Sequence, residues 1–334
     1  MIDSDIVVSS RIRLARNLAK VPFPNKLTAQ AASEHVAVPI NKILSDVSYL
    51  TVSHIRDMPT IDQQILHERR LISRDLMENA LNGSVAINND ESIAIMVNEE
   101  DHIREQCILP GLFLLECFEE LEKIDDQLIK ELDIAFDARL GFLTASPTNL
   151  GTGMRASVML FLPALTITGK INDIILNINK QNITVRGGSG EGSNAEGYTY
   201  QISNTVTLGA SEFDIIRNVT SAVKNIAELE TNARVSLYRE RATELTDQAL
   251  RAWGVLTNCF TITMNEFLQC LAKVKLGVSL GIINLKNKEL LNELDVRCRR
   301  ASLLKDNGRE LKDDEVDIFR ADYLMRTLSG NRII

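Results

Sequence analysis

The pattern of apolar and polar residues divides the chain into a first part of mixed periodicity and a last third of helical periodicity. Short runs rich in β-branched residues predict strands at residues 6–14, 91–99, 139–145, 182–186 and 198–208. Apolar residues at helical spacing predict helices at residues 28–47, 110–132, from about 152 onward, 171–179 and over most of 211–328. Strands followed by helices are typical of an α+β domain joined to a helical domain.

The change of pattern places the domain boundary inside the helical stretch between Ser211 and Thr246. We set it between positions 235 and 236, which gives an α+β domain of residues 1–235 and a helical domain of residues 236–334. A chain of 334 residues is long enough to give each of them a buried core.

Composition excludes several classes of protein. With 45% hydrophobic and 25% charged residues, the chain is neither disordered, collagen-like nor a disulfide scaffold. Its net charge is −8, so it has no general attraction for nucleic acid or for an anionic membrane. Any site for an anion must therefore be local.

Targeting and metal-binding signals are missing from the sequence. The start of the chain has no signal-peptide layout, and the longest apolar stretch, residues 158–167, is too short to span a bilayer and contains Pro163. The five cysteines form no C-x-x-C pair and the four histidines are scattered. We expect a reduced, cytoplasmic protein that holds no metal ion directly.

A glycine-rich segment, Gly187 to Gly192, follows one predicted strand. It is not a phosphate-binding P-loop, because no Gly-Lys-Ser/Thr follows it. Gly190-x-Gly192-x-x-Ala195 matches the loose dinucleotide fingerprint, but the next segment is predicted to be a strand, where that fingerprint requires a helix. Two interpretations remain: a surface loop, or a lid over a ligand with Glu191 at its tip.

Several arginines lie beside strand ends and glycine-containing loops. Arg11 and Arg13 alternate on one predicted strand, so both side chains point to the same face. Taken singly, each arginine could form an ordinary surface salt bridge. Together they could bind a triphosphate with Mg²⁺, because arginine forks supply converging cations without a P-loop. The set consists of Arg11, Arg13, Arg104, Arg155 and Arg186.

Four sequence blocks resemble the ATP:guanidino phosphotransferase family, which includes creatine and arginine kinases. The blocks are Ser-Ser-Arg-Ile-Arg at 9–13, Asn-Glu-Glu-Asp-His-Ile-Arg at 98–104, Pro-Thr-Asn-Leu-Gly-Thr-Gly-Met-Arg at 147–155 and Val-Arg-Gly at 185–187. They occur in the family's order. Residues 139–163, 190–193 and 201–204, with a helical region after them, are most similar to the branch of bacterial protein arginine kinases.

The resemblance implies a fold and a set of roles. The fold is an antiparallel-sheet catalytic domain flanked by helices, with a C-terminal helical domain for dimerisation and phosphoarginine recognition. The five arginines and Ser9 match nucleotide ligands, Glu100 the catalytic carboxylate and Glu191 a second guanidinium-binding carboxylate. ATP is then the phosphoryl donor, and Mg²⁺ is carried by the nucleotide.

Two positions depart from the family's pattern. Ser146 stands where most members carry a cysteine that tunes the guanidinium substrate, so activity should be lower and oxidation at this position absent. In the phosphoarginine-receptor motif R-D-x-x-R-A, Val316 replaces the first arginine, whereas Asp317 and Arg320 are kept. An ordinary amphipathic terminal helix is the alternative interpretation of that segment.

The leading hypothesis is a kinase that phosphorylates arginine side chains of proteins. By analogy it would form a homodimer, tag proteins for an AAA+ unfoldase–protease in a stress response, and respond to a small zinc-binding activator. The alternatives are a free-arginine kinase and a non-catalytic adaptor that binds phosphoarginine proteins or a protease. No nucleic-acid or membrane partner is expected.

Overall fold

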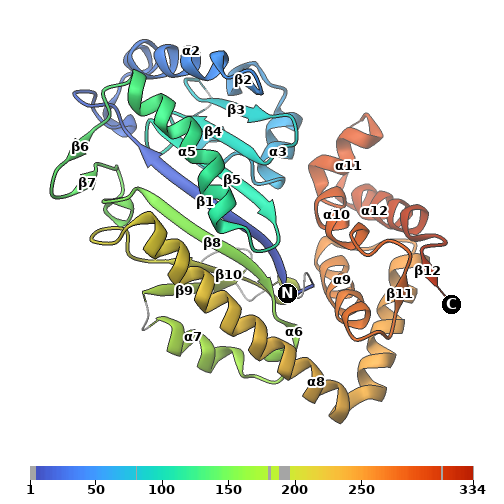
Figure 1. Cartoon of the computed structure of the whole chain (residues 1–334). Coiled ribbons are helices and arrows are strands. Elements are labelled where there is room, and N and C mark those ends of the chain that lie inside the picture. The colour runs from blue at the N-terminus through green and yellow to red at the C-terminus, as the bar shows by residue number, and fades with distance from the viewer. Residues whose placement is uncertain (1–4, 80, 180–181, 188–195, 310, 334) are drawn as a thin grey trace.

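The computed structural model describes residues 5–79, 81–179, 182–187, 196–309 and 311–333 (Figure 1). Its centre is an eight-stranded sheet of order β2-β3-β4-β5-β1-β8-β10-β9, in which every neighbouring pair is antiparallel. These strands are β1 Val7–Arg16, β2 Leu50–His54, β3 Ser84–Asn88, β4 Ile93–Val97, β5 Ile103–Pro110, β8 Met154–Phe161, β9 Ile183–Gly187 and β10 Thr199–Asn204. Two short antiparallel pairs join β6 Phe136–Asp137 with β7 Gly141–Phe142 and β11 Asn284–Leu285 with β12 Arg332–Ile333.

Helices lie between the strands of the sheet and after them in the chain. Those of the first two thirds are α1 Ala29–Ala31, α2 Val38–Asp46, α3 Thr60–Glu68, α4 Arg74–Glu78, α5 Leu114–Glu131, α6 Pro163–Ile167 and α7 Ile171–Asn179. The last third consists mainly of α8 Glu212–Asn258, α9 Met264–Ser279, α10 Leu290–Arg297, α11 Arg300–Asn307 and α12 Asp313–Leu328. The predicted α+β class with a helical C-terminal region is therefore confirmed. No helix in the described part of the chain is long and apolar enough to cross a membrane.

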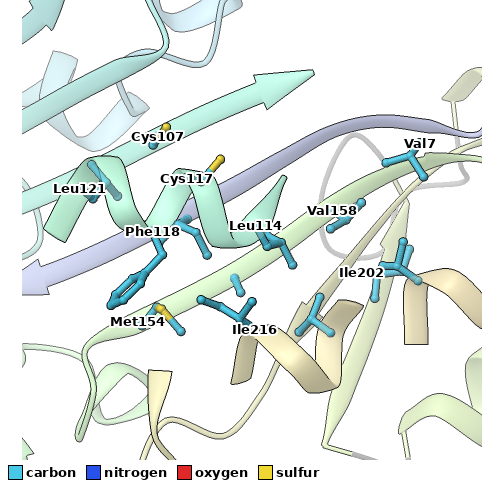
Figure 2. Close-up of a cluster of buried hydrophobic side chains, with 14 of the residues drawn as sticks. Val7, Cys107, Leu114, Cys117, Phe118, Leu121, Met154, Val158, Ile202 and Ile216 are labelled. Carbon is cyan, nitrogen blue, oxygen red and sulfur yellow. The ribbon is translucent and has the colours of Figure 1, made fainter. Parts of the chain in front are cut away.

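One face of the sheet is buried under α5 and α8. Figure 2 shows Phe118 of α5 beside Met154 of β8, and Ile216 of α8 below the same strand. Leu114 and Leu121 continue the apolar stripe of α5 and are fully or almost fully buried. Because successive side chains of a strand point to opposite faces, burial of this face leaves the other face of the same strands available for a site.

Residues 154–161 correct one sequence prediction. The pattern predicts a helix from about residue 152, but the segment is the central strand β8. Seven of its eight residues are buried, and its second half, residues 158–161, is continuously apolar. Periodicity alone does not separate such a run from a buried helix.

Two predicted elements differ clearly in extent from those in the structure. The predicted strand at 139–145 is reduced to the two residues of β7, and the helix predicted from 110 begins at Leu114, because Pro110 still belongs to β5. Strands β2, β3 and β5 were not predicted at all. The strands predicted at 6–14, 91–99, 182–186 and 198–208 are confirmed as β1, β4, β9 and β10.

Helix α8 joins the sheet to the C-terminal helices and crosses the proposed boundary between positions 235 and 236. Arg241 is the one residue described inside this helix with non-helical backbone angles. Buried α8 residues as far as Leu245 belong to the sheet-side core, and those from Ala249 onward pack in a second core with α9 and α12.

A second connection ties the C-terminal helices to the sheet domain through α3 and α11. The Glu68 carboxylate accepts hydrogen bonds from the backbone N–H groups of Ala301 (3.0 Å) and Ser302 (3.4 Å), and so caps the start of α11. Lys305 of α11 forms a salt bridge of 2.6 Å with Asp62 of α3. Together with α8, this contact holds the C-terminal helices beside the start of β1 (Figure 1).

Candidate active site

The five arginines singled out in the sequence lie on one face of the sheet. Arg13 on β1 is directly opposite Arg155 on β8, and Arg104 on β5 is opposite Ala15, which shares the face of Arg13. Residues opposite each other in antiparallel strands have side chains on the same face, and so do residues two apart in a strand. Ser9 and Arg11 therefore join the set. Arg186 on β9 joins it through Gln201 and Met159, which connect it across β10 and β8 to Ser9.

The arginines on this face bring like charges close together, which destabilises the fold in the absence of a bound anion. Two arginines directly opposite each other in a sheet repel. Burial, and then the neighbouring arginines, lower the pKa of Arg13 well below its ordinary value and the pKa of Arg11 to about 9. The Nε atoms of both are buried and have no hydrogen-bond partner among the described residues. Because a polyanion would satisfy these donors and relieve the repulsion, the face fits a nucleotide triphosphate.

Glu99 connects the arginine face to Glu100. Its carboxylate oxygens lie 2.5 and 2.6 Å from Nη1 of Arg104, and one of them accepts the backbone N–H of Glu100 at 2.7 Å. Burial alone would raise the pKa of Glu99, but the guanidinium of Arg104 outweighs burial and lowers it. Glu99 is therefore an ionised partner that orients Arg104 and fixes the turn carrying Glu100.

The carboxyl group of Glu100 is placed to act as a base. The side chain is exposed at the turn after β4, beside the end of β1. Partial burial, followed by the charge of Asp101, raises its pKa above the usual value for glutamate. A carboxyl group with a raised pKa is a stronger base for an N–H proton than an ordinary one.

Asp101 and Asn17 link this turn to the segment that carries Ser146. Oδ1 of Asp101 accepts hydrogen bonds from Nδ2 of Asn17 (2.6 Å) and from the backbone N–H of Ala145 (2.7 Å). Asn17 in turn accepts the backbone N–H of His102 at 2.9 Å. Ser146 is half-buried, and its Oγ lies 2.8 Å from Oγ1 of Thr148. The structure thus brings Glu100 and Ser146 to the same end of β1.

Replacing Asp101 by alanine should destabilise the fold, because the N–H groups of Asn17 and Ala145 would lose their buried acceptor. We expect a loss of about 2–4 kcal/mol in the free energy of unfolding, measured in urea. The matched control is Asp133→Ala, since Asp133 is 72% exposed and meets Lys20 at 3.5 Å. That change should cost under about 0.5 kcal/mol. Equal effects of the two substitutions would show that Asp101 does not hold the segment.

His102 completes this end of the site as a structural residue. Nδ1 accepts the backbone N–H of Leu18 at 3.0 Å, which leaves Nε2 to donate to the carbonyl oxygen of Pro22 at 2.9 Å. The ring is fully buried, and burial lowers its pKa. It is therefore a neutral imidazole that takes no part in proton transfer.

Two residues of the site, Gln106 and Asn17, are not among those singled out from the sequence. Gln106 accepts a hydrogen bond from the guanidinium of Arg11 and donates to the carbonyl oxygen of Arg70 at 2.7 Å. Its place two residues after Arg104 puts both on the same face, a signal that a prediction of β5 would have revealed. Asn17 follows β1, and no pattern in the sequence marks it. Glu191, predicted to carry the second carboxylate, lies outside the described residues.

Asp317 and Arg320 lie on α12, apart from the sheet. Arg320 is buried and donates to the carbonyl oxygens of Cys298 (2.9 Å) and Ile262 (2.8 Å) as well as to Asp317 (2.5 Å). Val316, at the position of the motif's first arginine, is buried in a small apolar cluster. These contacts give Arg320 a structural role, and phosphoarginine binding at this helix stays a prediction.

Comparison with known proteins decides the family. The model of "ATP:guanido phosphotransferase, C-terminal catalytic domain" matches residues 32–233, and that of "Protein-arginine kinase McsB C-terminal domain" matches residues 242–332. The chain belongs to the ATP:guanido phosphotransferase family. The resemblance of its sequence blocks to this family is thereby confirmed.

Relatives of this phosphotransferase follow it over nearly its whole length. The protein-arginine kinase of Caldanaerobacter subterraneus subsp. tengcongensis is 41% identical over 98% of both chains. That of Pelotomaculum thermopropionicum is 43% identical over 98% of this chain and 94% of its own. Among solved structures, lombricine kinase superposes with a TM-score of 0.62 at 26% identity, covering 70% of this chain and 68% of its own. The duplicated taurocyamine kinase of Schistosoma mansoni gives 0.61 at 28%, covering 79% and 38%.

Ser146 allows a direct test of this phosphotransferase's departure from the family's cysteine. The unsubstituted protein should keep its activity in iodoacetamide, because a hydroxyl at this position cannot form a thiolate. Ser146→Cys should become sensitive, with more than about a tenfold loss of activity after alkylation. Mass spectrometry would locate the label. Cys259→Ser in the same background is the control, since Cys259 is half-buried and the other cysteines are buried. If Ser146→Cys keeps its activity after alkylation, position 146 does not lie at the substrate site.

Proposed function

We propose that this chain transfers the γ-phosphoryl group of Mg-ATP to arginine side chains of proteins. One observation carries the proposal: five arginines converge on one sheet face that ends at Glu100. The similarity to protein-arginine kinases over nearly the full length supports a protein-borne arginine as acceptor.

The chemistry requires this combination of charges. A guanidinium has a pKa above about 12, so it is charged at neutral pH and its nitrogens are poor nucleophiles. Glu100 would grip the substrate guanidinium, aim one nitrogen at the γ-phosphorus and accept the proton as the N–P bond forms. Glu191 would supply the second carboxylate. The arginine face, with Ser9, would hold the phosphates, and the Mg²⁺ carried by the nucleotide would neutralise part of their charge.

No protein ligand for Mg²⁺ is needed in this proposal. Among the residues that the structure describes, no group of three or more His, Cys, Asp or Glu side chains could hold a metal ion. The nucleotide's phosphates are the natural ligands for a hard cation that keeps much of its water.

Wider roles belong to the same proposal and rest on the family. They are homodimerisation, phosphoarginine recognition through residues 236–334, stimulation by a zinc-binding activator, and tagging of cytoplasmic proteins for an AAA+ unfoldase. A non-catalytic adaptor is the second candidate, and Ser146 favours it, because a site without the family's thiol could have lost turnover. The retained arginines and Glu100 count against the adaptor.

The test is to incubate the protein with Mg-ATP labelled at the γ-phosphate and an arginine-rich unfolded protein, with free arginine in parallel. Acid-labile, base-stable label on the protein supports protein-arginine phosphorylation, because N–P bonds break in acid. Acid-stable label would indicate a hydroxyl acceptor and overturn the guanidino mechanism. Equal turnover of free arginine would indicate a small-guanidine kinase, and ATP binding without any label would favour the adaptor.

A further inference from the structure

A cleft of about 630 Å³ separates the arginine face from the C-terminal helices. The sheet side contributes Ser9 and Arg11, which belong to the nucleotide set, and Gln201. The opposite side is formed by α9 and α10, which contribute Lys275 and Val296 among others. This volume lies in the range of small-ligand sites.

A nucleotide bound along β1, with its γ-phosphate at Glu100, would have its nucleoside at the end of the strand where the cleft lies. Glu100 adjoins the end of β1, whereas Ser9 and Arg11 lie near its start and line the cleft. A strand rises about 3.3 Å per residue, so Ser9 and Arg13 are about 13 Å apart along β1, a length that a nucleoside triphosphate can span. With the γ-phosphate at Glu100, the base and ribose would point away from it, into the cleft. This step rests on the proposed function.

The lining of the cleft combines apolar and polar side chains. Apolar side chains line both of its sides, with Met159 on the sheet and Leu271 and Val296 on the helices. Charged side chains line the cleft as well, among them Arg70, Asp295 and Arg299, so apolar surface for a heterocycle lies beside groups that can form hydrogen bonds with a base or ribose. Lys275 is half-buried and lines the cleft together with Asp295; burial lowers the pKa of its ammonium, and the charge of Asp295 opposes that shift.

We propose that the C-terminal helices complete the ATP site by holding the nucleoside, with Val296 as a wall and Lys275 as a polar contact. These residues lie in the stretch 242–332, outside the match to the catalytic-domain model. The C-terminal region would then be part of the catalytic site and not only an attached recognition unit. It could sense the nucleotide directly, because the Glu68 cap and the Lys305–Asp62 salt bridge hold it against the sheet domain.

The experiment compares MgATP with magnesium tripolyphosphate, which has the phosphates but no nucleoside, by calorimetry on the full chain. Val296→Trp should fill part of the cleft and raise the Kd for MgATP at least about tenfold. Lys275→Met should raise it about three- to tenfold. Neither should change the Kd for tripolyphosphate more than about twofold. Lys286→Met, an exposed lysine outside the cleft, is the matched control and should change neither.

Each outcome decides the proposal. Selective weakening of MgATP supports it, and Asn292→Ala, which removes an exposed side chain of the cleft lining, serves if Val296→Trp does not fold. Unchanged binding of MgATP by Lys275→Met and the second variant would overturn it, and so would equal weakening of both ligands. Arg13→Gln tests the proposed function separately from the nucleoside proposal, because it should weaken the binding of both ligands. If it weakens neither, the arginine face does not bind the phosphates, and both proposals fail.

Discussion

Replacing Glu100 by glutamine is expected to lower kcat for arginine phosphorylation about 10²- to 10⁴-fold, the range contributed by a positioned general base. The amide keeps the size of the side chain and can still accept a hydrogen bond from the substrate, but it cannot take the proton. Because the phosphates are held by the arginine face, the affinity for MgATP should stay nearly unchanged. Steady-state kinetics would check the loss of kcat, and a separate measurement of nucleotide binding would check the unchanged affinity for MgATP.

The pH profile gives the same assignment a second test. Partial burial, then the charge of Asp101, raises the pKa of Glu100, and only the ionised form can accept a proton. Activity of the unsubstituted protein should therefore be full above this raised pKa and fall as the pH is lowered through it. In Glu100→Gln the residual activity should lose this acidic limb. An unchanged limb would assign the titration to another group.

Glu120→Gln is the matched control for the same chemical change. Glu120 lies on α5, with a side chain that is 48% exposed and paired with Lys123 at 2.7 Å. Removing that charge should leave kcat and the pH profile as they are. If Glu100→Gln keeps more than about half of the original kcat, Glu100 is not the base of the reaction.

The sequence predicts β1 as a strand but does not predict its neighbour β8 as one. Residues 6–14 predict a strand because they are rich in β-branched residues and partly alternate between polar and apolar; in the structure one face of β1 lies in the core and the other carries Ser9, Arg11 and Arg13. β8 lies between β1 and β10 and is buried at almost every position, and the apolar run in its second half, residues 158–161, is compatible with a helix as well as with a strand. Whether such a run is a strand depends on its partners, which are distant in the chain.

The site shows the same division between local and long-range information. That Arg11 and Arg13 share a face follows from their spacing alone. That Arg13 faces Arg155 depends on the register of β1 with β8, which joins segments about 140 residues apart in the chain, and no local pattern specifies it. Likewise, the hydrogen bond from the backbone N–H of Ala145 to Asp101 bridges two loops, and no local pattern in the sequence indicates it. Residue type and spacing therefore identify candidate site residues, whereas the pairing of distant strands determines which of them lie close together.

Replacing Arg13 by glutamine should lower activity and, without nucleotide, raise stability. Arg13 faces Arg155, its Nε has no partner among the described residues, and burial with neighbouring arginines lowers its pKa, so the folded state disfavours its charge. Removing the charge should raise the free energy of unfolding by about 0.5–1 kcal/mol. Because the same charge would neutralise the transferring phosphoryl group, kcat/KM should fall about 10³-fold.

Arg16→Gln is the control, because it makes the same change on the same strand with the opposite expected sign. Arg16 points to the other face of β1, where it is buried and paired with Asp125 at 2.7 Å, and it also donates to the carbonyl oxygen of Thr152 at 3.0 Å. Its removal leaves a buried carboxylate unpaired, at a cost of about 3–5 kcal/mol. Thermal unfolding with and without MgATP distinguishes the two arginines. Arg13→Gln should raise the apo Tm and lose most of the shift caused by MgATP, whereas Arg16→Gln should lower the apo Tm. A lower apo Tm of Arg13→Gln would mean that Arg13 supports the fold, and an unchanged shift with MgATP would mean that Arg13 does not bind the nucleotide.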